Sequence, residues 1–330
     1  MPTTILGAVR KRLTAPPLDV TSFAVRGFQT DAPARSKLEE SARQVTMGFE
    51  FAIEQKGNDE IADRIELLER EYRGLGYEGA AMGLALRDAM SPLPGHKNVE
   101  TFFGVGGRGA HQIFMAYIGM GFAVARLPRL LWKRALPNPR VMPDSPALSW
   151  IILDGYAFHE AYFKTQKWVH EQYVPPRLPW PWTGSHEWVR KTLDHGIGRA
   201  MWFINGGDVD RLSDLIESFV PARRADLWSG AALAASYAGG VGEDSLTEFV
   251  KKSWEYRVEV AQGCVFALKQ RVLSDLVTPH SVLAAQVFCD RTPEEAADIA
   301  NWAVVNLPEV EAGVPGYEIF RQRIQSKFKA

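Results

Sequence analysis

Cysteine is scarce and charge is balanced in this chain of 330 residues. The two cysteines, Cys264 and Cys289, are too few for a disulfide scaffold and are typical of a reducing compartment. The 38 basic residues are matched by 39 acidic ones, so the positive excess expected of a nucleic-acid-binding protein is missing. The sequence therefore predicts a cytoplasmic protein that does not bind nucleic acid.

Long hydrophobic runs are also missing. The longest uncharged apolar stretch covers residues 113–125, and a helix of that length reaches about 20 Å, whereas a bilayer core needs about 30 Å. We therefore expect a chain that is not integral to a membrane, with this stretch forming a buried core helix. A basic surface beginning at Arg126 that touches a membrane is the alternative. Abundant aromatic residues, with ten Trp, seventeen Phe and nine Tyr, supply the material for a large core.

Strand patterns are rare, whereas helical spacing of apolar residues is common. From Leu246 to Val272 the apolar residues keep one helical face for more than seven turns. Thr292-Pro293 followed by two glutamates places Pro at a first helical position with acids in the first turn. These patterns predict an all-α fold.

An internal repeat is visible at an offset of 151 residues, which is the difference between Gly79 and Gly230. In this register, nine of the 29 positions from 53 to 81 are identical to positions 204 to 232. We therefore predict an N-terminal segment (1–35), a first helical half (36–174), a Pro/Trp-rich linker (175–183) and a second helical half (184–330). The halves would pack face to face as one large helical domain, and a short TPR-like α-solenoid is the alternative. A homodimer is left open.

Small residues recur inside one predicted helix of each half, around Gly79 and Gly230. A glycine inside a helix costs about 1 kcal/mol relative to alanine, which is tolerable where another helix or a ligand must approach the backbone. One interpretation is close helix packing. The other is a ligand groove lined by small residues and rimmed by aromatics such as Tyr77 and Trp228.

Two arginines are candidates for holding an anion. Residues 104–109 satisfy G-x-G-x-x-G, but the β-α alternation and the following acid of a dinucleotide site are missing. What remains is a glycine loop carrying Arg108 at a helix start, suited to a carboxylate or phosphate, or a tightly turned connection. Arg224 precedes the second small-residue helix, either as an anion clamp or as part of an Arg–Asp pair.

Three residues are candidates for acid–base chemistry. His111 follows the glycine loop near a helix start, where a neutral imidazole is favoured. Asp154 and His159 lie in an aromatic-rich helical stretch and could form a polar patch over an apolar groove. Structural, hydrogen-bonded roles are the alternative for all three. No pattern of metal ligands or of a cofactor-binding loop is found, so neither a metal nor a cofactor is predicted.

Several long strings carry a family resemblance. They include GVGGRGAHQIFMAYIGMGFAVARLP, LSWIILDGYAFHEAYF and RRADLWSGAALAASYAGG. Across residues 23–324 the chain resembles the UnbL-type family of enediyne biosynthesis accessory proteins, which is domain-of-unknown-function family 1702. The resemblance implies a bacterial role in making or maturing a polyene-derived polyketide, such as an enediyne core, and it carries over no catalytic residues.

Together, the residues and the resemblance lead to one functional hypothesis. The chain would bind and process an apolar polyene in a groove or tunnel between its helices. Arg108 or Arg224 would hold a carboxylate end, while His111, Asp154 and His159 would line the chemistry. The alternative is a non-catalytic scaffold for other biosynthetic enzymes of the pathway, or a carrier, so whether the chain is an enzyme is left open.

Overall fold

The computed structural model describes residues 18–55, 57–91, 97–176 and 186–329. The all-α prediction is confirmed, because the described strands are only β1 (Val310–Glu311) and β2 (Val314–Pro315), which pair as an antiparallel hairpin. Residues 1–17 of the predicted N-terminal segment and 177–183 of the predicted linker lie outside the described residues. Among the described helices, none is both long enough and apolar enough to cross a bilayer.

Helices follow one another through both halves of the chain. The first half contains η1 (Leu18–Thr21), α2 (Phe23–Arg26), α3 (Arg35–Glu54), α4 (Asn58–Glu66), η2 (Arg70–Tyr72), α5 (Arg73–Met90), α6 (Asn98–Phe103), η3 (Ala110–Gln112), α7 (Ile113–Arg126), η4 (Arg129–Leu131), α8 (Trp132–Ala135), η5 (Pro139–Val141), η6 (Pro146–Trp150), α9 (Ile151–Phe163) and the π-helical turn η7 (Gln166–His170). The second half contains α10 (His186–Ile204), α11 (Val209–Glu217), α12 (Pro221–Ala238), α13 (Glu243–Lys252), η8 (Trp254–Tyr256), α14 (Arg257–Leu273), α15 (Pro279–Cys289), α16 (Pro293–Val304) and α17 (Gly316–Gln325).

The helix bounds recur between the halves. Helices α4 and α11 begin at 58 and 209 and end at 66 and 217, so both bounds differ by 151. Helices α3 and α10 also begin 151 residues apart, at 35 and 186. Further on the offset is 144, since η3 and α7 begin at 110 and 113 while η8 and α14 begin at 254 and 257. The repeat register found in the sequence therefore pairs helices that follow one another in the same order in both halves. The exact domain boundaries stay a prediction.

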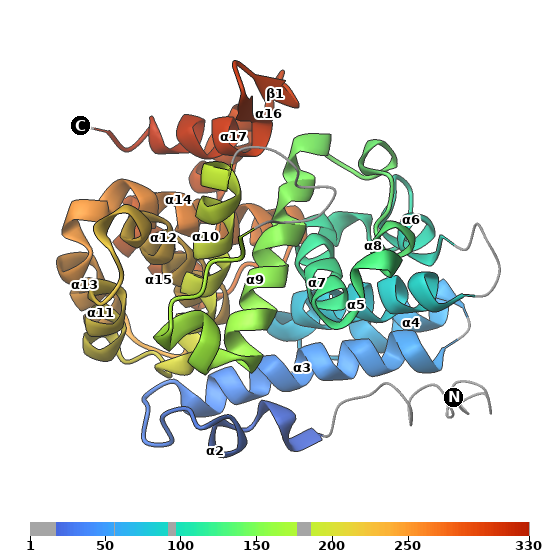
Figure 1. The fold of residues 1–330 in the computed structure, drawn as a ribbon, viewed down its shortest axis with the longest axis horizontal. Helices are drawn as coiled ribbons and strands as arrows, with labels where there is room; N and C mark the ends of the chain where they lie inside the picture. The colour runs from blue at the N-terminus through green and yellow to red at the C-terminus, as the bar shows by residue number, and fades with distance from the viewer. Residues whose placement is uncertain (1–17, 56, 92–96, 177–185, 330) are drawn as a thin grey trace.

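The long helices pack in chain order into a row that turns back on itself. In the order α3, α5, α7, α9, α10, α12 and α14, each helix packs against the one that follows it, and α9 and α10 join the two halves (Figure 1). At the ends of the row, α12 touches α3, and Gln270 of α14 donates hydrogen bonds to Gln112 Oε1 and the His111 carbonyl of η3. One continuous hydrophobic core runs through both halves.

One predicted helix is interrupted. The apolar face from Leu246 to Val272 is divided between α13 and α14, with the 3₁₀ turn η8 between them. The Ser253 hydroxyl donates to the Phe249 carbonyl, and Trp254, which the periodicity placed on the buried face, is 60% exposed. The prediction of one unbroken helix was therefore wrong, because a local side-chain bond ends α13 at this point. The start of α16 is confirmed, since Thr292 caps it and Pro293 is its first residue.

The small residues of α5 and α12 serve close helix packing. A Cβ at Gly79 would lie 1.8 Å from the Val45 carbonyl oxygen of α3, and a Cβ at Gly230 would lie 1.8 Å from the His195 carbonyl oxygen of α10. Backbone therefore meets backbone at both positions. Of the two interpretations of these glycines, the geometry matches helix packing.

We expect Gly79→Ala to lower the free energy of unfolding by about 1–3 kcal/mol, the usual cost of overpacking, despite the better helix propensity of alanine. Gly242→Ala is the matched control, because a Cβ there meets nothing within 4 Å. Urea denaturation of both variants measures the difference. Equal stabilities would show that α3 and α5 separate easily.

Candidate functional site

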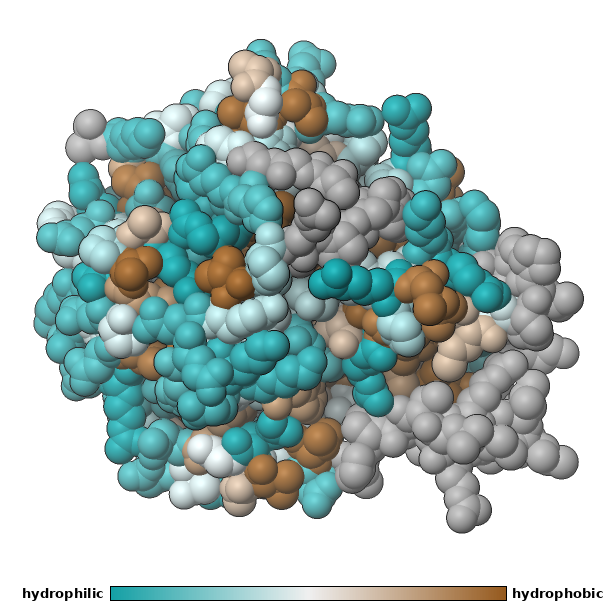
Figure 2. Space-filling view, in the orientation of Figure 1, coloured by the Kyte–Doolittle hydropathy of each residue, from teal (hydrophilic) through white to brown (hydrophobic). Residues whose placement is uncertain are grey.

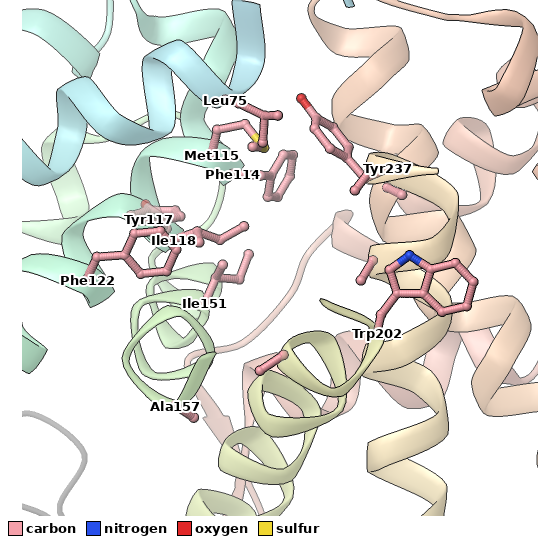
Figure 3. Packing of buried hydrophobic residues seen from close by; sticks show 14 of the residues in the cluster. Leu75, Phe114, Met115, Tyr117, Ile118, Phe122, Ile151, Ala157, Trp202 and Tyr237 are labelled. Carbon is pink, nitrogen blue, oxygen red and sulfur yellow. The ribbon is translucent and has the colours of Figure 1, made fainter. Parts of the chain in front are cut away.

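A cavity of about 140 Å³ lies inside the row of helices. Its wall takes residues from both halves and is mostly apolar, with many phenylalanines, among them Phe49, Phe114, Phe122, Phe158, Phe266 and Phe320. In Figure 3, Phe114, Ile118 and Ile151 face Tyr237 across an open space. Both halves therefore contribute to one apolar cavity, which is partly open to solvent.

Three polar side chains form a cluster in this apolar wall. Asp154, in the first turn of α9, lies opposite His195 and Arg199, which share one face of α10 because they are four residues apart. Asp154 Oδ2 lies 2.5 Å from His195 Nδ1, and Arg199 donates from Nη1 to Asp154 Oδ1. All three side chains are buried.

A glycine brings these helices together. A Cβ at Gly196, next to His195 on α10, would lie 2.2 Å from the Asp154 carbonyl oxygen of α9. Only a residue without a side chain allows this approach, which sets Asp154 within hydrogen-bond distance of His195. On the opposite side of α10, Gly230 lets α12 press against the His195 carbonyl. The backbone around His195 is thus held from two sides.

The imidazole of His195 is oriented with one nitrogen free. Nδ1 is bound to Asp154, whereas Nε2 is buried and meets no hydrogen-bond partner among the described residues. Burial lowers the pKa of His195, although Asp154 opposes the fall, so the neutral imidazole is favoured near pH 7. A carboxylate on Nδ1 fixes the tautomer in which Nε2 carries the lone pair. This arrangement is typical of a general base.

Asp154 remains ionised in spite of its burial. Burial alone would raise its pKa, but the charge of Arg199 and the hydrogen bond to His195 outweigh that effect and hold the pKa below its usual range. A stable carboxylate favours the imidazolium that forms when His195 accepts a proton. Asp154 therefore orients the neutral His195 and stabilises its imidazolium, whereas the charge of Arg199 disfavours the imidazolium.

Glu78 of α5 is a candidate proton donor. It lines the same cavity, and burial raises its pKa to about 8, with Arg199 opposing the rise and Asp154 adding to it. Within the described part of the chain no side chain or backbone group hydrogen-bonds to its carboxyl. Near pH 7 Glu78 is therefore mostly a neutral acid that can donate a proton, and it lines the same cavity as a histidine that can accept one.

This raised pKa predicts a pH-dependent stability. Folded Glu78 keeps its proton up to about pH 8, while in the unfolded chain the pKa is near the ordinary 4.5. The contribution of Glu78 to the free energy of unfolding is therefore fully present below about pH 4.5 and is lost as the pH rises through about 8. We expect Glu78→Gln to gain stability relative to the parent chain over that range, measured by urea denaturation from about pH 5 to about pH 9. A difference that does not change with pH would contradict a buried neutral carboxyl.

Of the predicted catalytic residues, Asp154 and His159 line the cavity and His111 does not. His159 lies between Phe122 and Phe163, and its Nδ1 has no partner among the described residues. Burial, together with the charge of Arg126, lowers its pKa to about 3, so it is neutral at any working pH. His111 instead packs edge-on against Tyr77. Their catalytic roles stay predictions, and the structure brings Asp154 to His195 instead of to His159.

The predicted binding residues lie outside the cavity wall. Arg108 is exposed and pairs with Asp59 and Asp63 of α4, while the Tyr77 hydroxyl donates to Glu66. Arg224 donates to the Phe219 and Glu217 carbonyls at the end of α11. The buried Trp228 packs edge-on against Phe249. Gly79 and Gly230 serve the helix contacts described above.

Glu78, His195 and Arg199 were missed by sequence reasoning. His195 belongs to no recognised catalytic or metal-ligand motif, and Glu78 lies in a run of small residues. A usable signal was present, because His195 and Arg199 are four apart with glycines at 196 and 198 between them. That pattern is typical of a polar face on a closely packed helix.

A model of a protein family of unknown function, DUF1702, matches residues 5–328. The chain belongs to the DUF1702 family. This match covers almost the whole chain, including both halves and every residue of the cavity wall. No curated protein and no solved structure matches this DUF1702 chain. Across its described residues, no group of three or more His, Cys, Asp or Glu side chains is placed to hold a metal ion.

Proposed function

We propose that this DUF1702 chain binds an apolar unsaturated small molecule in the central cavity and catalyses proton transfer on it. The observation that carries the proposal is a buried imidazole in an apolar wall, bound to Asp154 through Nδ1 and free at Nε2. Most buried polar side-chain atoms in proteins have a hydrogen-bond partner, and His195 Nε2 is an exception. Here the free nitrogen belongs to a side chain that lines a cavity.

The acid and the base together suit double-bond migration. His195 Nε2 removes a proton from a carbon activated by the conjugated chain, and the electron pair moves along that chain. Glu78 then delivers its proton to a carbon further along, and becomes a carboxylate while His195 becomes an imidazolium. Return of a proton from His195 to Glu78 restores both groups. The step is redox-neutral and its protons and electrons balance without another reactant.

The resemblance gives the proposal a biological setting. An apolar conjugated molecule of this kind is the polyene from which an enediyne core or a related polyketide is made. We therefore place the chain in such a biosynthetic pathway, acting on the polyene or on a product derived from it. The cavity's phenylalanine-rich wall suits a flat conjugated chain, since aromatic rings stack or pack edge-on against π systems.

The structure offers less support for the scaffold alternative. The face seen in Figure 2 is mostly hydrophilic, with apolar residues scattered over it. Partner-docking surfaces are commonly contiguous apolar patches. A carrier that binds the polyene without chemistry shares the cavity with our proposal and is separated from it by experiment.

The experiment incubates the purified chain with a linear conjugated polyene ketone in D₂O and follows its mass and absorbance. We expect deuterium to enter the polyene at carbons of the conjugated chain, because each proton transfer exchanges with solvent through His195 or Glu78. A polyene that binds but gains no deuterium would identify a carrier. A polyene that does not bind would overturn the proposal.

A further inference from the structure

A second, polar pocket adjoins the cavity. This polar annex encloses about 430 Å³ and is lined by Lys37, Glu71, Arg271 and His280, among others. It shares four wall residues with the apolar cavity, namely Ser41, Leu75, Tyr237 and Ala238. The two pockets therefore meet at these side chains.

One arginine of the annex is exceptional among the buried arginines. Four described arginines are buried, with exposed fractions of 1% to 6%. Three of them pair with carboxylates: Arg199 with Asp154, Arg223 with Asp194, and Arg321 with Asp226. Arg271 is the fourth, and no carboxylate of the described residues forms an ion pair with it.

The partners of Arg271 satisfy only part of its guanidinium. Nη1 donates to the Glu71 and Leu276 carbonyls, and Nη2 donates to the Tyr237 carbonyl. Nε is buried without a partner among the described residues. The guanidinium also lies 3.8 Å from the centre of the Tyr237 ring, which offers modest compensation for its charge. A buried charge that lacks a counter-ion is costly, so the site is short of one anion.

The neighbouring charges do not supply that anion. The nearest acidic side chain of the annex, Glu71, is 2.6 Å from Lys37 Nζ and is neutralised by it. Burial lowers the pKa of His280, whose Nε2 lies 2.8 Å from the Ala235 carbonyl oxygen, so His280 is neutral near pH 7 and adds no charge. With Lys37 and Arg271 against Glu71, the annex carries one net positive charge.

Tyr237 lies in the wall shared by the annex and the apolar cavity. Its hydroxyl is buried without a partner among the described residues, and its ring, which contacts the Arg271 guanidinium, also faces the open space of the cavity in Figure 3. A ligand chain running past Tyr237 would have one end near Arg271 and its body beside Phe114 and Leu75.

We infer that the annex binds the carboxylate end of the ligand, while its conjugated chain lies in the apolar cavity. This inference rests on the proposed function and narrows its substrate class to an amphiphilic polyene with a terminal carboxylate. A carboxylate in the annex beside the Arg271 guanidinium supplies the missing counter-ion, and the positive charge of Lys37 in the same wall reinforces the field. The roles first expected of Arg108 and Arg224 thus pass to Arg271.

The test uses cis-parinaric acid, a conjugated tetraene fatty acid that fluoresces in apolar surroundings, and its methyl ester. We expect the parent chain to bind the acid about tenfold or more tightly than the ester, because only the acid forms charge-assisted hydrogen bonds. The comparison needs no substitution, so it holds even if Arg271 variants fail to fold. Equal affinities would overturn the inference and leave the cavity proposal standing, whereas binding of neither ligand would overturn both.

A charge variant sharpens the test. Lys37→Gln removes one positive charge from the annex and should weaken binding of the acid about tenfold, with no change for the ester. Lys251→Gln is the matched control, because Lys251 is exposed on α13 and lines neither pocket. An equal loss for acid and ester in Lys37→Gln would point to a damaged fold and contradict carboxylate recognition.

Discussion

His195→Gln is expected to slow proton transfer to the bound polyene about 10²–10⁴-fold, the usual contribution of a positioned general base. Glutamine keeps a polar side chain opposite Asp154 but cannot accept and release a proton near neutral pH. Because His195 Nε2 contributes little to the apolar wall, affinity for the polyene should remain within about twofold. Deuterium uptake from D₂O measures the rate, and fluorescence of the bound polyene measures the affinity.

The control for this variant is His170→Gln, at an exposed histidine of η7. It should leave both the rate and the affinity unchanged. Uptake that persists in His195→Gln would remove His195 from the mechanism, and His159, which faces the same cavity, would then be the next histidine to replace. A loss of affinity equal to the loss of rate would show that the substitution damages the cavity instead of the chemistry.

Asp154→Asn is expected to lower the free energy of unfolding by about 3–5 kcal/mol, because it leaves the buried Arg199 without its counter-ion. The same change removes the carboxylate that holds His195 Nδ1. The loss in free energy of unfolding should therefore be larger than for substitutions that remove one partner of a surface ion pair, which cost about 0–1 kcal/mol. Chemical denaturation at pH 7 measures the change.

A double-variant cycle isolates this ion pair. Arg199→Met removes the orphaned cation, so Asp154→Asn combined with Arg199→Met should be clearly more stable than the sum of the two single losses predicts. Arg108→Met, which breaks an exposed pair with Asp59 and Asp63, is the control and should cost little. If the losses of the two single variants simply add, Asp154 and Arg199 do not form this ion pair.

The fold could be predicted largely from local patterns. Helical periodicity, Pro at first helical positions and the repeat offset are visible in the sequence itself, and they predicted the start of α16 and a repeat register that pairs α4 with α11. The sequence did not predict the break between α13 and α14 at Ser253, because the helical spacing of apolar residues continues across the single 3₁₀ turn. The glycines of α5 and α12 were recognised as places of close approach, but what approaches them is a property of the packed helices.

The site could be predicted only in part. Asp154 was visible as an acid in an otherwise aromatic and apolar helix, which is a local signal. Its partner His195 lies 41 residues away on another helix, and Glu78 lies in a third. Their meeting depends on the order of the helices around the cavity and on the close approach at Gly196. Arg271 carried no signal either, since an arginine without a counter-ion is recognised only when its surroundings are known.

The most direct test is an experimental structure of the chain with a bound conjugated polyene. The account predicts electron density along the central cavity, with a carbon of the conjugated chain near His195 Nε2 and another near the Glu78 carboxyl. Density on the outer surface only, or a cavity closed by its own side chains while the polyene remains bound elsewhere, would contradict it.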